Sequence, residues 1–306
     1  MKSDLIEKIK ALKTRRKAVV LAHNYQSPEI QDLADFAGDS LGLSVQAAQT
    51  DAEVIVFCGV RFMAETAVIL SPDKAVLLPD KHAGCPMADM ITVDELREHK
   101  ANYPGALVVC YVNSTADVKA LSDYCCTSSN ALELVRTLPT DKPILFVPDQ
   151  NLGNYVKQRC PEHDIVLWPG FCRSHILITA QDVRDAKAAH PGAVVLAHPE
   201  CKDEVKDLAD ELLSTGQMLT FVKTSAASKY IIATEVGILH SLKKANPEAG
   251  YVAASERAYC ENMKKITVEK VLWALEDMVH PVTVPQDVSV RAKLALDRMI
   301  AVLPKI

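Results

Sequence analysis

The sequence predicts an α/β protein built from three pseudo-equivalent three-layer α/β/α units with parallel sheets, arranged around a pseudo-threefold axis. The first observation is a repeat: VVLAHNYQSPEIQDLAD at 19–35 returns as VVLAHPECKDEVKDLAD at 194–210, with ten of seventeen positions identical. A weaker copy, GALVVCYVNSTADVKALSD, lies between them at 105–123. A spacing of about 87 residues indicates one structural unit repeated three times. The second observation is that short apolar runs alternate with helical patterns, which is typical of parallel strands covered by helices on both faces.

The repeat divides the chain into units with boundaries at 1–86, 87–173 and 174–261. The remaining segment, 262–306, lies outside the repeat, and we expect its helices to pack back on the first unit.

Continuous apolar runs mark the expected strands of each unit. In the first unit they lie at 18–22, 53–59 and 75–79, with a helix expected over 27–38 because Ser-Pro opens it as N-cap and first helical residue. The corresponding strands of the other two units are 106–112, 144–149, 164–170, 193–198, 230–237 and 251–255.

The composition fits a large core and argues against several classes of partner. Of 306 residues, 49% are hydrophobic and 24% are charged, with a net charge of -5 and a pI near 6.0. This apolar content excludes a disordered chain. The absence of a long basic block argues against nucleic acid as a partner. No signal-peptide pattern and no apolar run near 18 residues occur, so we expect no membrane association and a cytoplasmic location.

Polar residues follow the first strand of each unit, at the position where open parallel sheets bind ligands. They are His23 and Tyr25, then Tyr111 and Asn113, then His198 and Glu200. The apolar part of the repeat is retained because each unit must bury the same surfaces, whereas these residues have diverged. We infer that each unit contacts a different part of one asymmetric ligand in a shared site.

A hydroxyl residue recurs seventeen positions after the strand-end residue in every copy, at Ser40, Ser128 and Thr215. Each stands near a predicted helix start, where free backbone N–H groups bind anions. An N-cap role would explain any one of them alone. Because all three have matched offsets, we expect them to bind a phosphate or carboxylate.

Three of the nine cysteines, Cys85, Cys172 and Cys260, occupy equivalent loops in the three units. Three converging thiolates in a reduced compartment favour a soft metal centre. An iron-sulfur cube on three cysteines would leave one iron open to substrate. A three-cysteine zinc lyase or aldolase is the alternative, and a non-enzymatic cluster-bearing sensor is a third. The other assigned cysteines, including Cys125 and Cys126 in an expected helical stretch, are interpreted as core residues.

Short motifs along nearly the whole chain carry a family resemblance. They are HNYQ, GDS, GCPMADM, YVNS, TSSNA, PDQNLG, WPGFCRSH, HPEC, ATEVG and CENMKKIT. With them the sequence resembles the bacterial, A-type quinolinate synthases of NAD biosynthesis. The resemblance implies a three-unit fold with a 4Fe-4S cluster on Cys85, Cys172 and Cys260. It also implies that iminoaspartate and dihydroxyacetone phosphate are condensed to quinolinate with loss of phosphate and two waters, with an iminoaspartate-supplying oxidase as a partner.

The resemblance also suggests roles for individual side chains. Glu200 is expected as general base, which would require its environment to raise its pKa, and Tyr25 as acid or proton relay. His23 and His198 are expected to contact carboxylate or phosphate and to transfer protons, because imidazole titrates near neutral pH. His175, three residues after Cys172, is expected to reach the same centre or to support it. Tyr111 and Asn113 are expected as neutral hydrogen-bond donors.

Overall fold

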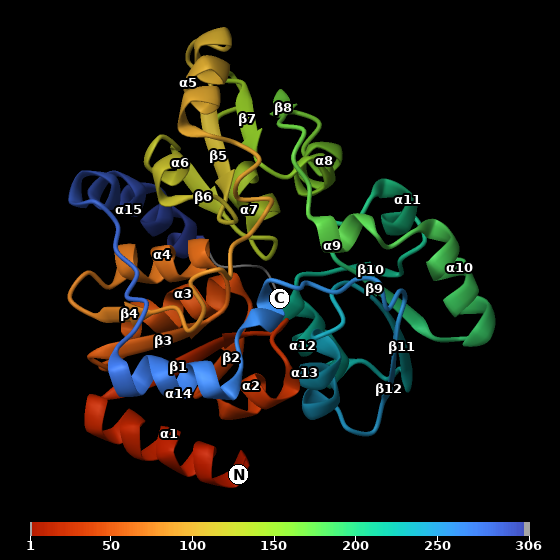
Figure 1. Cartoon of the computed structure of the whole chain (residues 1–306). Coiled ribbons are helices and arrows are strands. Elements are labelled where there is room, and N and C mark those ends of the chain that lie inside the picture. The colour runs from red at the N-terminus through yellow and green to blue at the C-terminus, as the bar shows by residue number, and fades with distance from the viewer. Residues whose placement is uncertain (1, 303–306) are drawn as a thin grey trace.

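The computed structural model describes residues 2–302 and consists of three four-stranded parallel sheets with helices on their faces (Figure 1). The first sheet has the spatial order β2 (Phe36–Gly38), β1 (Ala18–His23), β3 (Val54–Cys58) and β4 (Ala75–Leu77). The second has the order β6 (Tyr124–Cys126), β5 (Leu107–Tyr111), β7 (Ile144–Val147) and β8 (Ile165–Leu167). The third has the order β10 (Glu211–Leu212), β9 (Val194–Ala197), β11 (Lys229–Ala233) and β12 (Gly250–Ala253). The three units share one topology, which confirms the predicted fold class.

Helices connect the strands and cover the sheets. Those of the first unit are α1 (Lys2–Arg16), α2 (Pro28–Leu33), α3 (Ser40–Gln49) and α4 (Arg61–Leu70). The second unit has α5 (Val93–Asn102), α6 (Ala116–Ala120), α7 (Ala131–Arg136) and α8 (Gln150–Arg159). The third has α9 (Arg173–Ile176), α10 (Ala180–Ala189), α11 (Asp203–Lys206), α12 (Thr215–Thr224) and α13 (Ile238–Ala245). The 3-10 turn η1 (Met263–Lys265), α14 (Val268–Asp277) and α15 (Gln286–Ala301) follow, and no described helix has the length and apolarity needed to cross a membrane.

Each unit contains a short edge strand that the sequence did not reveal. β2, β6 and β10 have only two or three residues, too few to show a period. The helix expected over 27–38 therefore ends at Leu33, where the chain turns into β2. Cys125 and Cys126, expected in a helical stretch, lie in β6 instead.

The aspartate that closes each copy of the repeat makes the same two hydrogen bonds in every unit. Asp35, Asp123 and Asp210 each accept, through Oδ2, the N–H of the valine fifteen positions earlier, at 2.8, 2.8 and 2.7 Å. The backbone N–H of each aspartate donates to the carbonyl of that same valine. These bonds fix the connection between the first strand and the edge strand, which explains why the residue is retained where its neighbours differ.

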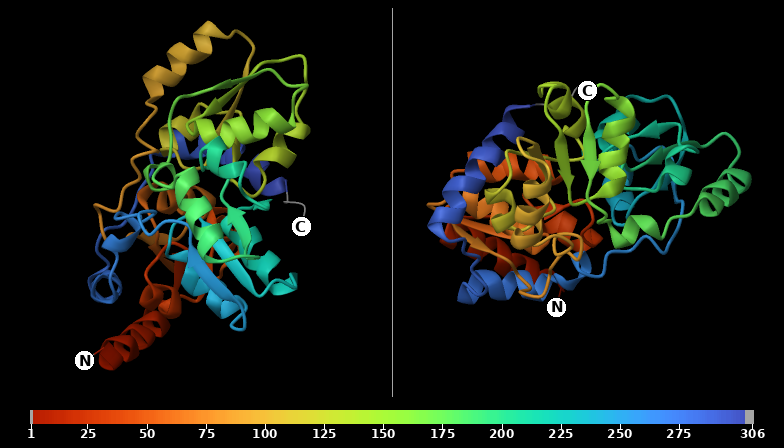
Figure 2. Two further views of the ribbon diagram at one scale, coloured as in Figure 1. Left: turned by 90° about the vertical axis from the view of Figure 1, so that its right-hand side faces the viewer. Right: turned by 90° about the horizontal axis from the view of Figure 1, so that it is seen from above.

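The C-terminal helices differ in their packing. α14 lies on α1 beside the first sheet, whereas α15 lies against α6 and β6 of the second unit and α4 of the first (Figure 1). Figure 2 shows α15 along the outside of these two units. The segment after residue 262 thus contacts the first unit through α14 and α15, and α15 also links it to the second unit.

One large hydrophobic core includes side chains from all three sheets, such as Leu21, Phe146 and Tyr230. A smaller core, which includes Val195 and Ile231, covers the other face of the third sheet. Because the larger core is shared, the three units are held in one arrangement by apolar burial.

The repeated aspartate bond predicts the effect of Asp123→Ala. The substitution leaves the N–H of Val108 without its side-chain acceptor, which typically costs about 1 to 3 kcal/mol of unfolding free energy. Urea unfolding of the variant should show this loss. Asp185→Ala, on the exposed face of α10, is the matched control and should change stability by less than about 0.5 kcal/mol. Equal effects in the two variants would contradict a structural role for the repeated aspartate.

Candidate active site

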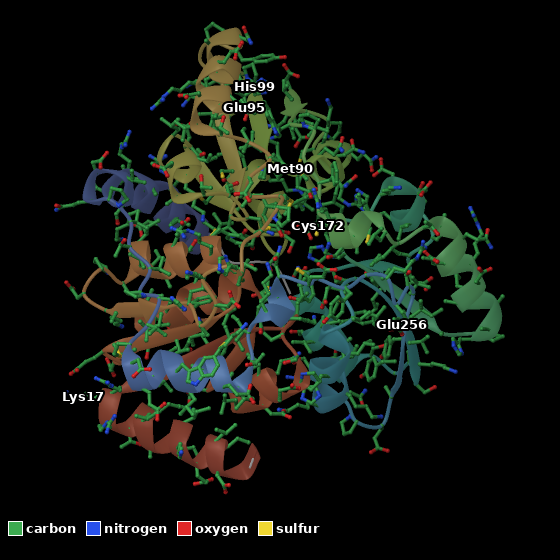
Figure 3. The ribbon with its side chains drawn as sticks, in the orientation of Figure 1. Lys17, Met90, Glu95, His99, Cys172 and Glu256 are labelled. Carbon is green, nitrogen blue, oxygen red and sulfur yellow. The ribbon has the colours of Figure 1, made fainter. Side chains whose placement is uncertain are left out.

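The carboxyl ends of the three sheets border one cavity of about 320 Å³. All thirteen residues that the sequence nominated line this cavity: His23, Tyr25, Ser40, Cys85, Tyr111, Asn113, Ser128, Cys172, His175, His198, Glu200, Thr215 and Cys260. In Figure 3, Cys172 lies near the middle of the molecule, whereas Lys17 lies at its lower left edge and Glu95 towards its top. The three units therefore bring these residues to one place.

Two strand-end histidines have the same local geometry. His23 Nδ1 accepts the backbone N–H of Tyr25 at 3.1 Å, and His198 Nδ1 accepts that of Glu200 at 3.3 Å. With Nδ1 as acceptor, the hydrogen of each neutral ring is on Nε2. His198 Nε2 lies 3.1 Å from Ser128 Oγ, so it contacts the second unit from the third.

Burial sets the charge of these histidines. It lowers the pKa of His23 and of His198 to about 3, with Lys264 adding to the effect at His23 and Glu200 opposing it at both. Both imidazoles are therefore neutral near pH 7. The expectation that they titrate near neutral pH is wrong, because it took no account of desolvation.

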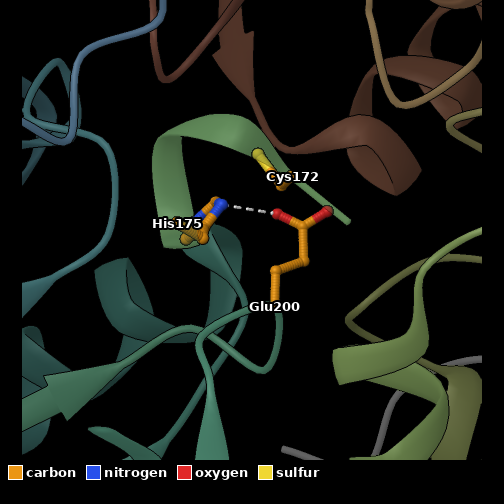
Figure 4. A group of neighbouring side chains, drawn as sticks. All are labelled: Cys172, His175 and Glu200. Atoms are coloured by element: carbon orange, nitrogen blue, oxygen red, sulfur yellow. Dashed lines mark ion pairs between the residues drawn. The ribbon is translucent and has the colours of Figure 1, made fainter. Parts of the chain in front are cut away.

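Glu200 lies beside the histidines at the end of the third sheet. Its Oε2 is 2.8 Å from His175 Nδ1 and 3.4 Å from His198 Nδ1, and Figure 4 shows the contact with His175. Burial alone would raise the pKa of Glu200, but His175, His198 and the Tyr111 hydroxyl together lower it. The expectation of a raised pKa is therefore wrong, because the effects of these neighbours outweigh desolvation.

The two tyrosines of the cavity keep their protons. Burial, and then the negative charge of Glu200, raise the pKa of Tyr25 and of Tyr111 well above the usual value. Both phenols therefore act as hydrogen-bonding groups near neutral pH.

Hydroxyl residues from the three units meet at helix starts. Ser40 and Thr215 are the first residues of α3 and α12, whereas Ser128 precedes Asn130, the residue that caps α7. The neighbouring residues join the units directly, because Ser129 Oγ donates to Asp39 Oδ2 at 2.6 Å and lies 3.0 Å from Ser214 Oγ. The prediction that each hydroxyl residue stands near a helix start is thus confirmed. Ser40 and Thr215 are first helical residues, and Ser128 lies three residues before the first residue of α7.

The three cavity cysteines are free thiols of intermediate exposure. Burial raises the pKa of all three, that of Cys85 to about 12, so each thiol would release a proton on binding a metal. One zinc ion bonds sulfur at about 2.3 Å, which requires its sulfur ligands to lie within about 4 Å of one another. Among the described residues, the ligand atoms of Cys172, His175 and Glu200 all lie within 4.8 Å of one another. The sulfur atoms of the three cysteines do not form such a group. The three sulfurs are therefore spaced more widely than a single ion requires.

A buried ion pair connects the loop of Cys260 with the loop of Tyr25. Glu235 is fully buried, and its Oε1 accepts from Lys264 Nζ and from the N–H of Cys260, the latter at 2.9 Å. Lys264 Nζ also donates to the carbonyl of Tyr25. The pair thus fixes a cavity cysteine relative to a cavity tyrosine of another unit.

Sequence reasoning missed the residues that support the cavity wall. Glu235 and Lys264 lie in the motifs ATEVG and CENMKKIT, and Asp39 lies in GDS, but none was assigned a role. The positions of these residues in the sequence do not indicate their roles, because the residues that they contact lie in distant segments of the chain. Cys201, also unassigned, is a buried core residue of the third unit.

Comparison with known proteins shows the family to which the chain belongs. The profile of the family described as quinolinate synthetase A protein matches residues 7–301. The chain is 54% identical to a quinolinate synthase of Dehalococcoides mccartyi (strain CBDB1) over 296 residues, covering 97% of each protein. It is 54% identical over 300 residues to one of Methanosarcina barkeri, covering 98% of each. It is 50% identical over 298 residues to one of Thermodesulfovibrio yellowstonii, covering 97% of this chain and 98% of that relative.

Together these observations define an α/β enzyme of three similar units, whose candidate active site is the cavity lined by residues from all three. The chain belongs to the quinolinate synthase family, whose members are enzymes of NAD biosynthesis. The family resemblance is therefore confirmed, and it extends beyond bacteria because Methanosarcina is an archaeon.

The Glu235–Lys264 pair predicts a large loss of stability in Lys264→Met. The variant leaves the Glu235 carboxylate buried without its cation, which typically costs about 3 to 5 kcal/mol. Lys244→Met is the control, because Lys244 and its partner Asp32 are more than half exposed and such pairs contribute about 0 to 1 kcal/mol. Chemical unfolding should separate the two variants clearly. Similar small losses in both would show that Glu235 does not depend on Lys264.

Proposed function

We propose that this chain condenses iminoaspartate with dihydroxyacetone phosphate to give quinolinate, phosphate and two waters, using a 4Fe-4S cluster held by Cys85, Cys172 and Cys260. The observation that carries the proposal is the cavity, where the three repeat-equivalent cysteines and the polar strand-end residues of all three units face one space. Family membership supports the same product.

The cysteines fit a cluster better than a single ion. Each is a free thiol at the cavity, each comes from a different unit, and the set is wider than one zinc ion would need. When bound through three thiolates, such a cluster supplies a Lewis acid at its remaining iron.

Buried polar atoms without partners mark where substrate would bind. Asn113 Oδ1 and Glu200 Oε1 are both buried and accept no hydrogen bond from the described chain. An unpaired buried polar atom is costly, so a ligand that donates to these atoms would be stabilised. The neutral His23 and His198 rings would donate from Nε2 to carboxylate or phosphate oxygens.

The hydroxyl residues would hold the most charged part of the substrates. Ser40 and Thr215 stand at the N-termini of ten-residue helices, where the helix dipole and the free N–H groups favour an anion. Ser128 lies beside His198 and completes this group.

Proton transfers are assigned to Glu200 and Tyr25. Glu200 is ionised, buried and equipped with a free oxygen, so it would accept a proton from bound substrate. Tyr25 lines the same cavity from the first unit and would exchange a proton with the opposite side of the substrate. Tyr111, whose hydroxyl bonds Glu200, and His175 would orient that carboxylate.

A zinc lyase or aldolase is the second candidate function. Its support in the structure is the compact group Cys172, His175 and Glu200, which could hold one ion. That arrangement would leave Cys85 and Cys260 without a metal, although they occupy equivalent positions in the repeat.

The proposal includes a supplier of iminoaspartate and a cytoplasmic location. Iminoaspartate is aspartate from which two electrons and two protons have been removed, so the supplying reaction is an oxidation. Both the oxidase and the location remain predictions.

Anaerobically purified protein should contain about four irons and four sulfides per chain. Replacing Cys85, Cys172 or Cys260 with Ala should remove the cluster and the activity. Cys58→Ala and Cys160→Ala are matched controls, because these buried thiols lie in the core, and each should cost only about 1 to 3 kcal/mol of stability. Iron and sulfide assays decide the outcome, and stoichiometric zinc without sulfide would refute the cluster.

Tyr25→Phe and Glu200→Gln should each reduce turnover by about 10²- to 10⁴-fold, the usual share of a positioned acid or base. Both changes preserve shape, so iron content should match that of the wild type. Quinolinate formation from the two substrates under anaerobic conditions is the measurement. Tyr251→Phe and Glu248→Gln, away from the cavity, should retain wild-type rates. Full activity in both cavity variants would mean that these residues are only scaffold.

A further inference from the structure

The charged side chains that line the cavity are unevenly divided between the two signs. Within the described part of the chain, the lining contains one permanent cation, Arg173. It contains four carboxylic acids, Asp39, Glu200, Glu235 and Glu261. The lining histidines His23 and His198 add no charge near pH 7, because burial lowers the pKa of both to about 3. A negatively charged substrate therefore meets one permanently positive side chain in this lining.

Arg173 lies where the cavity opens to solvent. Most lining residues are buried or half-buried, and the exposed ones are Arg173, Leu177, Tyr259 and Glu261. They come from two segments, residues 173–177 and 259–261, which together form the mouth of the cavity. Ser174 Oγ joins the segments by donating to the carbonyl of Tyr259 at 3.3 Å. A substrate that enters through the mouth therefore passes the guanidinium of Arg173.

The guanidinium of Arg173 is free to bind a ligand. Within the described part of the chain it forms no hydrogen bond, ion pair or ring contact. Glu261, the other charged side chain at the mouth, is not paired with it. Arg257, close to the mouth in sequence, is by contrast held by two hydrogen bonds to Asp182, at 3.0 and 2.7 Å. The N–H groups of Arg173 thus remain available to an incoming anion.

The backbone holds Arg173 at the mouth although its side chain is exposed. It is the first residue of α9 and lies between Cys172 and His175, both of which line the cavity. The carbonyl of Cys172 accepts the N–H of Ile176 at 3.1 Å, and His175 Nδ1 lies 2.8 Å from Glu200 Oε2. The position of Arg173 is therefore fixed by the same contacts that form the cavity wall.

We propose that Arg173 is a substrate-binding residue that receives the anionic groups of the entering substrates at the mouth. A guanidinium binds the oxygens of a carboxylate or phosphate through two parallel hydrogen bonds, which a lysine or a neutral donor does not reproduce. Dihydroxyacetone phosphate and iminoaspartate carry these groups. The inference rests on the proposed function, which supplies the identity of the substrates. It adds a charged contact that the hydroxyl residues and the neutral imidazoles do not offer.

Arg184 shows what an exposed arginine outside the cavity looks like in the same unit. It lies on α10, is exposed and does not line the cavity. Like Arg173, its side chain has no partner among the residues that the structure describes. Arg184→Gln is therefore a matched control, because it changes the charge of the protein equally without changing the mouth.

Arg173→Gln removes the charge and keeps a polar side chain. In anaerobic quinolinate synthesis, kcat/KM should fall by about 10-fold, the usual effect of losing a hydrogen bond to a charged group. The change should lie in KM, with kcat altered by less than about 3-fold, because Arg173 acts on binding and not on the reacting atoms. Arg173→Lys, which keeps the charge without the paired hydrogen bonds, should be intermediate. Arg184→Gln should match the wild type.

Two further kinetic measurements test the charge itself. Added salt should lower kcat/KM of the wild type more than that of Arg173→Gln, because salt screens the attraction between the mouth and an anion. Glu261→Gln should act in the opposite direction and lower KM, since it removes a negative charge from the mouth. The same salt dependence in the wild type and in Arg173→Gln would contradict attraction by Arg173.

Equilibrium binding separates this inference from the proposed function. Anaerobic calorimetry would use dihydroxyacetone phosphate as the phosphate probe and quinolinate as the dicarboxylate probe. At least one should bind about 10-fold more weakly to Arg173→Gln than to the wild type, and the affected probe identifies the group that Arg173 contacts.

Unchanged affinity for both probes would overturn the proposal, as would equal losses in Arg184→Gln. A loss of iron in Arg173→Gln would indicate an effect on the loop of Cys172 and would also overturn it. Wild-type protein that binds the probes but forms no quinolinate would instead refute the proposed function, while the comparison of affinities would still test Arg173.

Discussion

The central constraint on this molecule is that the polar ends of three parallel sheets meet in its interior, where most of their side chains are buried. Backbone and side-chain groups there need hydrogen-bond partners, because an unpaired buried polar group costs free energy. Each unit obtains partners from its neighbours. Gln31 Nε2, for example, has two hydrogens to share among three nearby carbonyls: those of Asn24 and Gln26 in its own unit, at 3.1 and 2.7 Å, and that of Gly237 in the third unit, at 2.8 Å. The contact of Ser129 with Asp39 and Ser214 joins all three units in the same way. The cavity is thus enclosed by the hydrogen bonds that hold the units together.

This constraint explains both the retention and the divergence of the repeated sequence. The valines of the first strands and the closing aspartates serve each unit internally, so they are the same in every copy. Residues after the strand ends contact other units or the cavity, whose surroundings differ from unit to unit. His23 and His198 fold back on their own loops identically, yet the residues two positions later are a tyrosine and a glutamate with different partners. The three copies of the repeat therefore differ most at the strand ends, where the surroundings of each unit are different.

The sequence predicted the fold class, nine of the twelve strands and thirteen of the residues that line the cavity, because repetition placed them at equivalent sheet ends. It could not predict the supporting residues. Thr234 contacts Tyr25 from more than two hundred positions away, and Lys264 reaches the same loop from the C-terminal segment. Such contacts have no period and no fixed spacing. Charge states were also mispredicted, since the pKa values of Glu200 and His198 depend on burial and on one another rather than on residue type.

The charges of the cavity wall affect how the cofactor and the substrates of the proposed reaction can bind. Both substrates are anions, and the cavity wall already holds the ionised Glu200 and three thiols that would become thiolates on binding a metal. Four negative charges without compensation would repel such substrates. Burial prevents this by keeping the thiols protonated until a metal supplies positive charge. Neutral imidazoles and helix N-termini then offer hydrogen-bond donors to the substrates. Before a metal binds, the protonated thiols and neutral imidazoles leave these groups with the single negative charge of Glu200.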